Sequence, residues 1–301
     1  MRKYFSLVKR NCKLFFKDKG MFFCSLITPL ILLVLFVTFL GKAFKESYWS
    51  MLPAGVDVSE RIISGLAGGQ LLSALLSVSC VTVAFCANML MVQDKMSGAR
   101  KDLLMTGLKK SELSISYYIA TLITTLIIAF VATFVSFIYL AIVGWFLSFL
   151  DCVLIFLDVL LLTMFGTAMS SLVNYFLNTQ GQVSAVATIV SSMYGFISGA
   201  YMPIATFSPI LQKFLKFMPS TYASSIIRNH CMKGALEEFG ECGIPSAAMT
   251  EIKKSIDYDL YWGGIKVPIL AMYGILVATI IVFLVAYILI NKFTEKKKRK
   301  N

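Results

Sequence analysis

The stretch that decides the fold is QDKMSGARKDLLMTGLKKSEL, residues 93–113, where mixed charges separate two long apolar runs. Its middle predicts a short helix, with Ser97 as the N-cap and Gly107 just beyond the last turn. Leu103 and Leu104 are apolar side chains in a loop that has no core of its own. We expect this helix to contact either a protein partner or the headgroups of a membrane.

The composition around this stretch is that of a membrane protein. Of the 301 residues, 58% are hydrophobic and only 15% are charged. The apolar residues gather in runs of about 20 or more, and at ~1.5 Å per residue such a run crosses a hydrocarbon core of ~30 Å. The chain is therefore expected to be an all-α polytopic membrane protein, and its net charge of +12 to reflect topology rather than nucleic-acid binding.

The apolar runs predict six transmembrane helices in a single transmembrane domain, residues 1–301. The predicted spans are 21–40, 65–92, 114–143, 152–172, 183–201 and 265–290. Residues 1–19 predict a basic amphipathic helix lying on the surface of the cytosolic leaflet. A cytosolic loop, 93–113, and an outer region, 203–264, complete the domain.

Positive charge sets the orientation. The N-terminal helix, the 93–113 loop and the tail together carry 18 Lys and Arg residues against 5 acidic residues, whereas the outer segments are balanced. Because Lys and Arg are retained on the cytosolic side, both termini are expected in the cytoplasm and the protein in the plasma membrane.

The outer region begins with two short amphipathic segments. Ser208 and Pro209 are typical of the start of a helix, and a second helix is expected from Pro219 to near Gly234. Both are too short to cross a bilayer, so they predict a re-entrant helical hairpin before the last span. If the second helix turns back at Gly234, two cysteines come close, and a disulfide is predicted. The pair is Cys231 and Cys242.

Small and polar residues mark two of the spans. Ser73 and Ser77 lie along one side of the second span, and Ser191 lies on the fifth. Gly195 and Gly199 form a G-x-x-x-G, which predicts close helix packing within the chain or between copies.

One acidic residue, Asp158, is placed inside a span. An ionisable group there is either functional or held by hydrogen bonds near the outer interface, and we favour the second interpretation.

Two motifs together resemble the membrane-spanning subunit of ATP-binding-cassette (ABC) exporters of the type-2 permease class. DKMSGARKDLLMTGLKKSEL is similar to that family's E-x-x-x-G-T-x-E-x-L-L-x-T-P-x-x-x-x-E-L loop, with Gly107 in place of the usual proline. SGAYMPIATFSPILQKFLKFMPSTYASSIIR is similar to its G-x-x-x-P, P, P-x-T-Y and Arg pattern after the fifth span. The span order agrees as well, so the resemblance covers essentially the whole chain.

The resemblance implies a role for each motif. The first would be a coupling helix that sits in a groove of an ATPase, with Gly98, Arg100, Leu103, Leu104, Thr106 and Glu112 as its residues. The second would close the outer exit, with Pro203, Pro209, Pro219, Thr221, Tyr222 and Arg228. The second and fifth spans would line the path.

The resemblance also implies the partners. Two copies of a P-loop ATPase and a second copy of this chain, or a paralogue, would complete the transporter. The chain has no G-x-x-x-x-G-K-[ST] motif, so ATP and Mg would bind on the ATPase. No catalytic, cofactor or metal residue is expected here. The cargo would be amphipathic or hydrophobic: a drug, a peptide or a lipid-like molecule.

Other functions stay open from the sequence. An ion-coupled secondary transporter would usually carry more ionisable residues at the midplane. An intramembrane enzyme acting on lipid would need a constellation of His, Asp or Ser at membrane depth, and none is expected from the sequence. A non-transporting immunity or sensor protein could share the whole fold.

Overall fold

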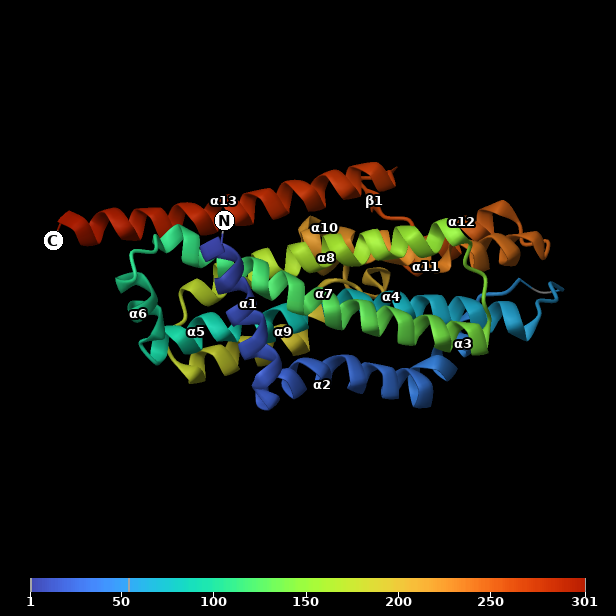
Figure 1. Cartoon of the computed structure of the whole chain (residues 1–301). Helices are drawn as coiled ribbons and strands as arrows, with labels where there is room; N and C mark the ends of the chain where they lie inside the picture. Colours follow the sequence, from blue (N-terminus) through green and yellow to red (C-terminus); the bar gives the residue numbers. More distant parts are fainter. Residues whose placement is uncertain (1, 54, 301) are drawn as a thin grey trace.

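The computed structural model describes residues 2–53 and 55–300, and the side chains of residues 4–53 and 55–292. Its described part is a long helical bundle with one small β-hairpin (Figure 1). The first helices are α1 (Arg2–Lys17), α2 (Lys19–Leu35), α3 (Gly41–Ser50), α4 (Glu60–Ala87), α5 (Met89–Met96), α6 (Ala99–Met105) and α7 (Lys110–Val143). They are followed by α8 (Phe149–Tyr175), α9 (Gln180–Ile197), η2 (Ile204–Thr206), α10 (Pro209–Phe217), α11 (Pro219–Glu241), α12 (Ser246–Ser255), β1 (Tyr261–Trp262), β2 (Ile265–Lys266) and α13 (Ile269–Lys300).

Five helical segments among the described residues are long and apolar enough to cross a membrane. They are Lys19–Ser50, Glu60–Met96, Lys110–Val143, Phe149–Tyr175 and Ile269–Lys292. The fifth predicted span, 183–201, corresponds to α9, which has 18 residues and is not among these five. At ~1.5 Å per residue α9 is about 27 Å long, so its crossing stays a prediction.

The first membrane segment is longer than predicted. A π-helical turn, η1 (Phe36–Leu40), joins α2 to α3 without a break, so the helix continues to Ser50. The outer segment expected from Gly41 therefore starts about three turns later. The second segment extends to Met96 but changes helix at Asn88, which ends α4 and begins α5.

Helix α4 is the centre of the bundle. It is surrounded by other helices, and 89% of an apolar 18-residue stretch within Glu60–Met96 is buried inside the bundle, where α4 packs against α2, α7, α8 and α11. Lipid is as apolar as leucine, so such packing depends on close approach rather than on the hydrophobic effect. Glycine allows that approach: a Cβ on Gly69 would lie 2.5 Å from the carbonyl oxygen of Cys231 in α11. A Cβ on Gly166 of α8 would lie 2.9 Å from the carbonyl oxygen of Cys80 in α4.

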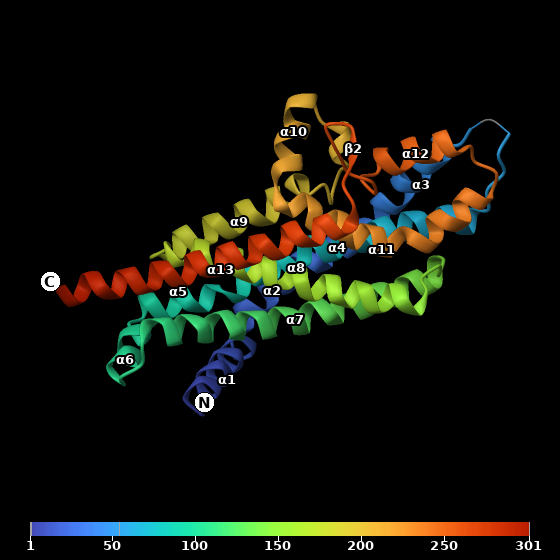
Figure 2. The ribbon, with the colours of Figure 1, turned by 90° about the horizontal axis from the view of Figure 1, so that it is seen from above.

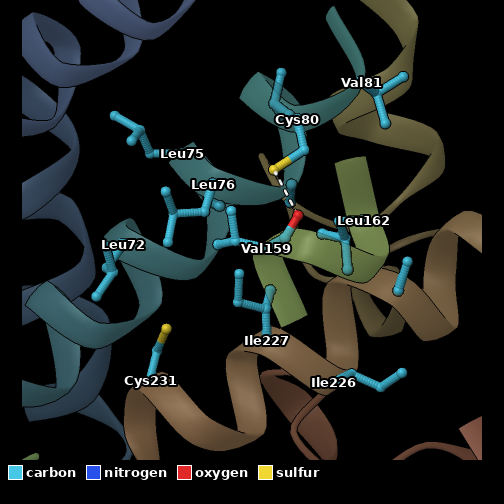
Figure 3. Packing of buried hydrophobic residues seen from close by; sticks show 14 of the residues in the cluster. Leu72, Leu75, Leu76, Cys80, Val81, Val159, Leu162, Ile226, Ile227 and Cys231 are labelled. Atoms are coloured by element: carbon cyan, nitrogen blue, oxygen red, sulfur yellow. Dashed lines mark hydrogen bonds between the residues drawn. The ribbon is translucent and has the colours of Figure 1, made fainter. Parts of the chain in front are cut away.

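The main core forms where α4, α8 and α11 meet (Figure 3). Leu76 of α4, Val159 of α8 and Ile227 of α11 are completely buried there. The Cys80 thiol points to the carbonyl oxygen of Val159, at an Sγ–O distance of 3.9 Å. Cys80 therefore acts as a small buried hydrophobe, as expected for a thiol inside a span.

The bundle has two unlike ends. Helix α6 and the C-terminal end of α13 lie at one end, and α3 and α12 lie at the other (Figure 1). Helix α10 projects from the bundle, with the β2 strand beside it (Figure 2). The membrane depth of α10 and α11, and the interfacial position of α1, stay predictions.

Helix α11 differs from its prediction, and this removes the predicted disulfide. Instead of ending near Gly234, α11 continues to Glu241, and the missing Cβ of Gly234 allows close packing against the carbonyl of Phe146 rather than a helix end. Cys231 and Cys242 are then 11 residues apart along one axis, about 16 Å. A disulfide needs Cα atoms within ~7 Å, and both thiols are free.

The predicted G-x-x-x-G packing face is also wrong within the chain. Gly195 is covered by the ring of Tyr201 from the following turn, which an added Cβ would approach to 2.3 Å. Gly199 lies past the end of α9, with φ at 70°, in the left-handed region. There the N–H of Ala200 donates to the carbonyl of Gly195 at 2.8 Å, so these glycines end the helix.

Candidate functional site

Helix α6 is a seven-residue helix between two left-handed glycines. Gly98 precedes it with φ at 86°, and Gly107 follows it with φ at 81°. The predicted end at Gly107 is therefore confirmed. The predicted N-cap is wrong, because Ser97 ends α5 and Gly98, which has no side chain to accept a hydrogen bond, precedes α6.

The two leucines of α6 do have a core. Leu103 and Leu104 are partly buried and pack against a cluster formed by α5, α7 and α13. The buried members of this cluster are Met91, Leu113, Tyr117 and Tyr287. Met105 points away and is 83% exposed. The apolar side chain that α6 presents to its surroundings is therefore Met105.

Two polar residues of the loop stabilise the backbone. The Thr106 hydroxyl donates to the carbonyl of Leu103 at 2.7 Å and closes the last turn of α6. The Glu112 carboxylate accepts the backbone N–H of Lys109 at 3.0 Å and so caps α7. Both residues hold the loop in shape.

Arg100 connects α6 to the last membrane helix. Its guanidinium donates to Oδ1 of Asn291 in α13 at 3.4 Å and lies 6.0 Å from the ring centre of Tyr175 in α8. The Ser114 hydroxyl of α7 donates to the same Asn291 oxygen at 2.7 Å. A displacement of α6 is thus opposed by contacts to α7, α8 and α13 together.

An ion pair attaches α1 to the base of this loop. Arg10 donates to both oxygens of Asp94 at 2.7 and 3.1 Å, and the Tyr117 hydroxyl donates to Asp94 at 2.6 Å. These contacts raise the pKa of Arg10. Next in the chain, Lys95 donates to the carbonyls of Tyr175 and Leu177, where a cation is favoured by the C-terminus of α8.

Sequence reasoning missed most of these partners. Asp94 and Lys95 lie inside the quoted stretch, and their position just after an apolar run is the one available signal that they face the bundle. Arg10 lies in residues 1–19, which the sequence predicts as a basic interfacial helix, and that pattern indicates no partner for it. Asn291 follows the last predicted span, and nothing in its neighbourhood points to α6.

A second group of predicted residues meets away from α6, where α11 contacts the end of α9 and the segment that follows α12. Arg228 of α11 is 1% exposed and donates to the carbonyl of Gly199, and to that of Asp257 at 3.3 Å. The Asp257 carboxylate lies 3.8 Å from the same guanidinium and accepts the N–H of Ile204. Burial raises the pKa of Asp257, and Arg228 opposes that shift. Arg228 therefore ties the ends of α9 and α12 to α11.

The remaining predicted exit residues shape the helices there. Pro209 and Pro219 are the first residues of α10 and α11, where proline's missing N–H costs nothing. Pro203 precedes η2. The Thr221 hydroxyl donates to the carbonyl of Leu215 at 2.7 Å, and Tyr222 is buried in the main core.

Asp158 has two partners that the sequence did not reveal. Its Oδ2 lies 2.6 Å from Nδ1 of His230 in α11, and its Oδ1 accepts the hydroxyl of Tyr273 in α13. Asp158 is completely buried. This agrees with the structural interpretation, in which hydrogen bonds hold the carboxylate.

An apolar groove runs between α2 and α9, with a volume of about 660 Å³. Ser191 lies in its wall, beside Thr28, Thr188 and mainly aliphatic neighbours. Ser73 and Ser77 are 1% and 0% exposed within α4. The second span therefore does not line a path in this structure; α2 and α9 form the open groove surface.

These features define a multi-pass helical membrane protein with a helical loop exposed at one end. A comparison with protein-family models matches residues 2–230 to the ABC-2 type transporter model. The chain therefore belongs to the ABC-2 type transporter family. Permeases of this family mediate transport and are not themselves catalytic. They normally work with an ATPase subunit, and they dimerise. A search of curated proteins found no match.

Proposed function

We propose that this chain is the permease subunit of an ATP-driven exporter in the plasma membrane, with both termini in the cytoplasm. The proposal depends mainly on the position of α6. In this member of the ABC-2 type transporter family, α6 lies at one end of the bundle and exposes the side chain of Met105. Its other side contacts α5, α7, α8 and α13. An exposed apolar residue on a helix connected to the membrane helices is suited to transmit movement from a docked ATPase.

The ATPase supplies the energy in this proposal. Two copies, each binding ATP and Mg, dock on the α6 helices of two permease chains. The two conformations of the transporter differ in their affinity for nucleotide, and this difference drives the switch between inward and outward opening. Through Arg100 and Leu104, a movement of α6 reaches α13 and α5, and α5 continues into α4.

The groove between α2 and α9 is the proposed substrate surface. Its aliphatic wall suits the apolar part of a cargo, and Thr28, Thr188 and Ser191 offer hydroxyl groups to a polar part. With a second copy or a paralogue facing it, the groove would close into a central path. We therefore propose an amphipathic or hydrophobic cargo, such as a drug, a peptide or a lipid-like molecule.

The exit side is assigned to α10 and α11. In this proposal they form a re-entrant hairpin, and Arg228 with Asp257 holds the base of the hairpin against α9 and α12. The residues grouped there would then limit opening to the outside.

The test is transport with the ATPase that co-purifies with the tagged chain. Inside-out vesicles containing both subunits should accumulate a fluorescent amphipathic dye or lipid analogue when ATP is added. Vesicles with the ATPase P-loop lysine replaced by alanine are the control. Retention of the ATPase without ATP-driven accumulation of any cargo would support a non-transporting immunity or sensor role instead.

One observation favours a second candidate, an ion-coupled secondary transporter. Asp158 and His230 are buried, and with the partly buried Tyr273 they form a group of titratable side chains between three helices. That function predicts cargo movement driven by a proton gradient in vesicles that lack the ATPase. The absence of such movement would leave the ATP-driven proposal.

A further inference from the structure

A cavity of about 670 Å³ lies between α10, α12 and the β1–β2 hairpin, away from α6 and from the α2–α9 groove. Figure 2 shows α10 rising from the bundle with the hairpin next to it. Two helices and a turn supply its walls. The residues used below are Lys213 and Lys216 of α10, Glu251 and Lys254 of α12, and Tyr261 and Trp262 of β1.

The cavity has an excess of positive charge. Three lysines line it, and Glu251 is the one acidic residue in its wall. Glu251 lies 3.8 Å from Lys254 and is paired with it. Lys213 and Lys216 therefore face the cavity without an acidic partner in its wall.

The acidic residues just behind the wall are already paired. A smaller cavity of about 170 Å³ shares Lys216 and Lys254 and reaches Asp257 and Asp259. Asp257 is held by Arg228, and Asp259 lies 2.7 Å from the ammonium group of Lys266. Arg228 and Lys266 offset much of this acidic charge, and Lys216 also acts on Asp257. Lys213 and Lys216 both still line the open cavity.

The chemistry of the donors selects the ligand. Lysine ammonium groups are compact point charges that bind phosphate oxygens without requiring the planar geometry that arginine needs. Trp262 is 50% exposed, and with Tyr261 it forms an aromatic wall. Exposed tryptophan and tyrosine are typical of the headgroup level of a membrane.

The exposed apolar face of α10, next to its lysine face, indicates the source of the phosphate. Ile210, Phe214 and Phe217 on this short helix are 85%, 57% and 73% exposed. An amphipathic helix with such a face lies with its apolar side in the acyl region and its polar side at the headgroups. The lysine side of α10 would then be at the depth of lipid phosphates.

We propose that this cavity binds the phosphate of an anionic phospholipid headgroup, with Lys213 and Lys216 as its ligands, Lys254 adding positive charge to the wall, and Trp262 against the glycerol region. A soluble phosphate ester offers the same chemistry. This inference rests on the proposed function in one respect: the proposed orientation decides which leaflet supplies the lipid. Binding itself requires neither the ATPase nor transport.

The experiment uses the emission of Trp262 in the full chain, purified in a neutral detergent. Trp49→Phe and Trp145→Phe leave Trp262 as the reporter, since the chain has three tryptophans. The probes are short-chain phosphatidylglycerol, short-chain phosphatidylcholine and glycerol 1-phosphate. We expect phosphatidylglycerol to change the emission saturably and phosphatidylcholine to have little effect.

The Lys213→Gln/Lys216→Gln variant should raise the Kd for phosphatidylglycerol by about tenfold or more, because two charge-assisted contacts to one phosphate are lost. The matched control is Lys42→Gln/Lys253→Gln, which removes the same charge from α3 and from α12 outside the cavity wall. It should leave the Kd within about twofold. Thermal unfolding without lipid checks that both variants fold.

The probes separate the two sources. Binding of phosphatidylglycerol but not of glycerol 1-phosphate supports the lipid, whereas equal binding of both supports a soluble phosphate ester in the same site. No saturable change with either probe would overturn the proposal. An equal response to phosphatidylcholine that persists in the Lys213→Gln/Lys216→Gln variant would overturn it as well.

Discussion

His230 and Asp158 lie 72 residues apart in the chain, yet Nδ1 of the one is 2.6 Å from Oδ2 of the other inside the bundle. Asp158 also accepts the Tyr273 hydroxyl, so this contact joins α8, α11 and α13. The chain has one histidine. That histidine, His230, contacts Asp158, the acidic residue that the sequence places inside a span.

This contact predicts the effect of removing one partner. His230→Ala leaves a buried carboxylate with Tyr273 as its remaining partner, and losing half of a buried pair costs about 3 kcal/mol or more. We expect a clear fall in the melting temperature of the purified protein in detergent. His230→Ala/Asp158→Asn should recover part of the loss, because the uncompensated charge is gone. Equal destabilisation in the single and double variants would contradict the pairing.

The close approach of α4 and α11 predicts a large effect from a single methyl group. Gly69→Ala places a Cβ 2.5 Å from a backbone carbonyl that cannot move aside, so we expect destabilisation of about 1–3 kcal/mol. Gly181→Ala is the matched control, since nothing lies within 4 Å of its added Cβ. The control should be neutral or slightly stabilising. Unfolding midpoints of the two variants in the same detergent measure the difference.

The general architecture was predictable from the sequence, because long apolar runs have few stable alternatives in a membrane. Residues 93–113 were identified as the exposed loop for the same reason: charges do not stay in hydrocarbon. Helix ends were less predictable. The continuation of the first segment through η1 to Ser50, and of α11 past Gly234, depends on packing against α4 and Phe146 that no local pattern encodes.

The candidate site shows the same division. The residues of the 93–113 loop predicted a short helix that ends at Gly107. They did not predict which side chains of α6 face the bundle. Leu103 and Leu104 pack against Met91 of the preceding helix and against Tyr287, which is distant in sequence. The G-x-x-x-G of α9 was misinterpreted because Gly199 serves a turn whose left-handed backbone is visible only in three dimensions.

The orientation of the chain can be tested by cysteine labelling. Single cysteines at Ser50, Ser208 and Ser246, each exposed in the structure, should react with an impermeant thiol reagent in intact cells. A cysteine at Ser97, which is exposed at the α6 end, should react only after lysis, and so should one at Thr294. The native cysteines must be removed first, because Cys24 is itself exposed. Labelling of Ser97→Cys in intact cells would reverse the proposed topology.

The attachment of α1 predicts a coupled effect on the loop. Asp94→Asn removes the charge that holds Arg10 and keeps an acceptor for the Tyr117 hydroxyl. We expect α1 to become more accessible to protease, while the spans still insert. Lys101→Gln in α6 is the control, because Lys101 is exposed and forms none of the contacts described above. Unchanged protection of α1 in Asp94→Asn would mean that its buried apolar side chains, Leu7 and Phe15, suffice to hold it.

Met105 provides the sharpest test of ATPase docking. Replacing Leu103 and Leu104 by aspartate would also damage the core beneath α6, so a lost complex would have two explanations. Met105→Asp avoids this, because the side chain is 83% exposed in the isolated chain and touches no core cluster. Its melting temperature should therefore match that of the unmodified chain. Burying the new carboxylate against an apolar ATPase groove costs several kcal/mol, so the variant should fail to retain the ATPase on co-purification. Leu104→Ala is the matched control, and it should lower the melting temperature by opening the core while keeping the ATPase bound. A fully retained and coupled ATPase in Met105→Asp would exclude this face of α6 as the docking surface.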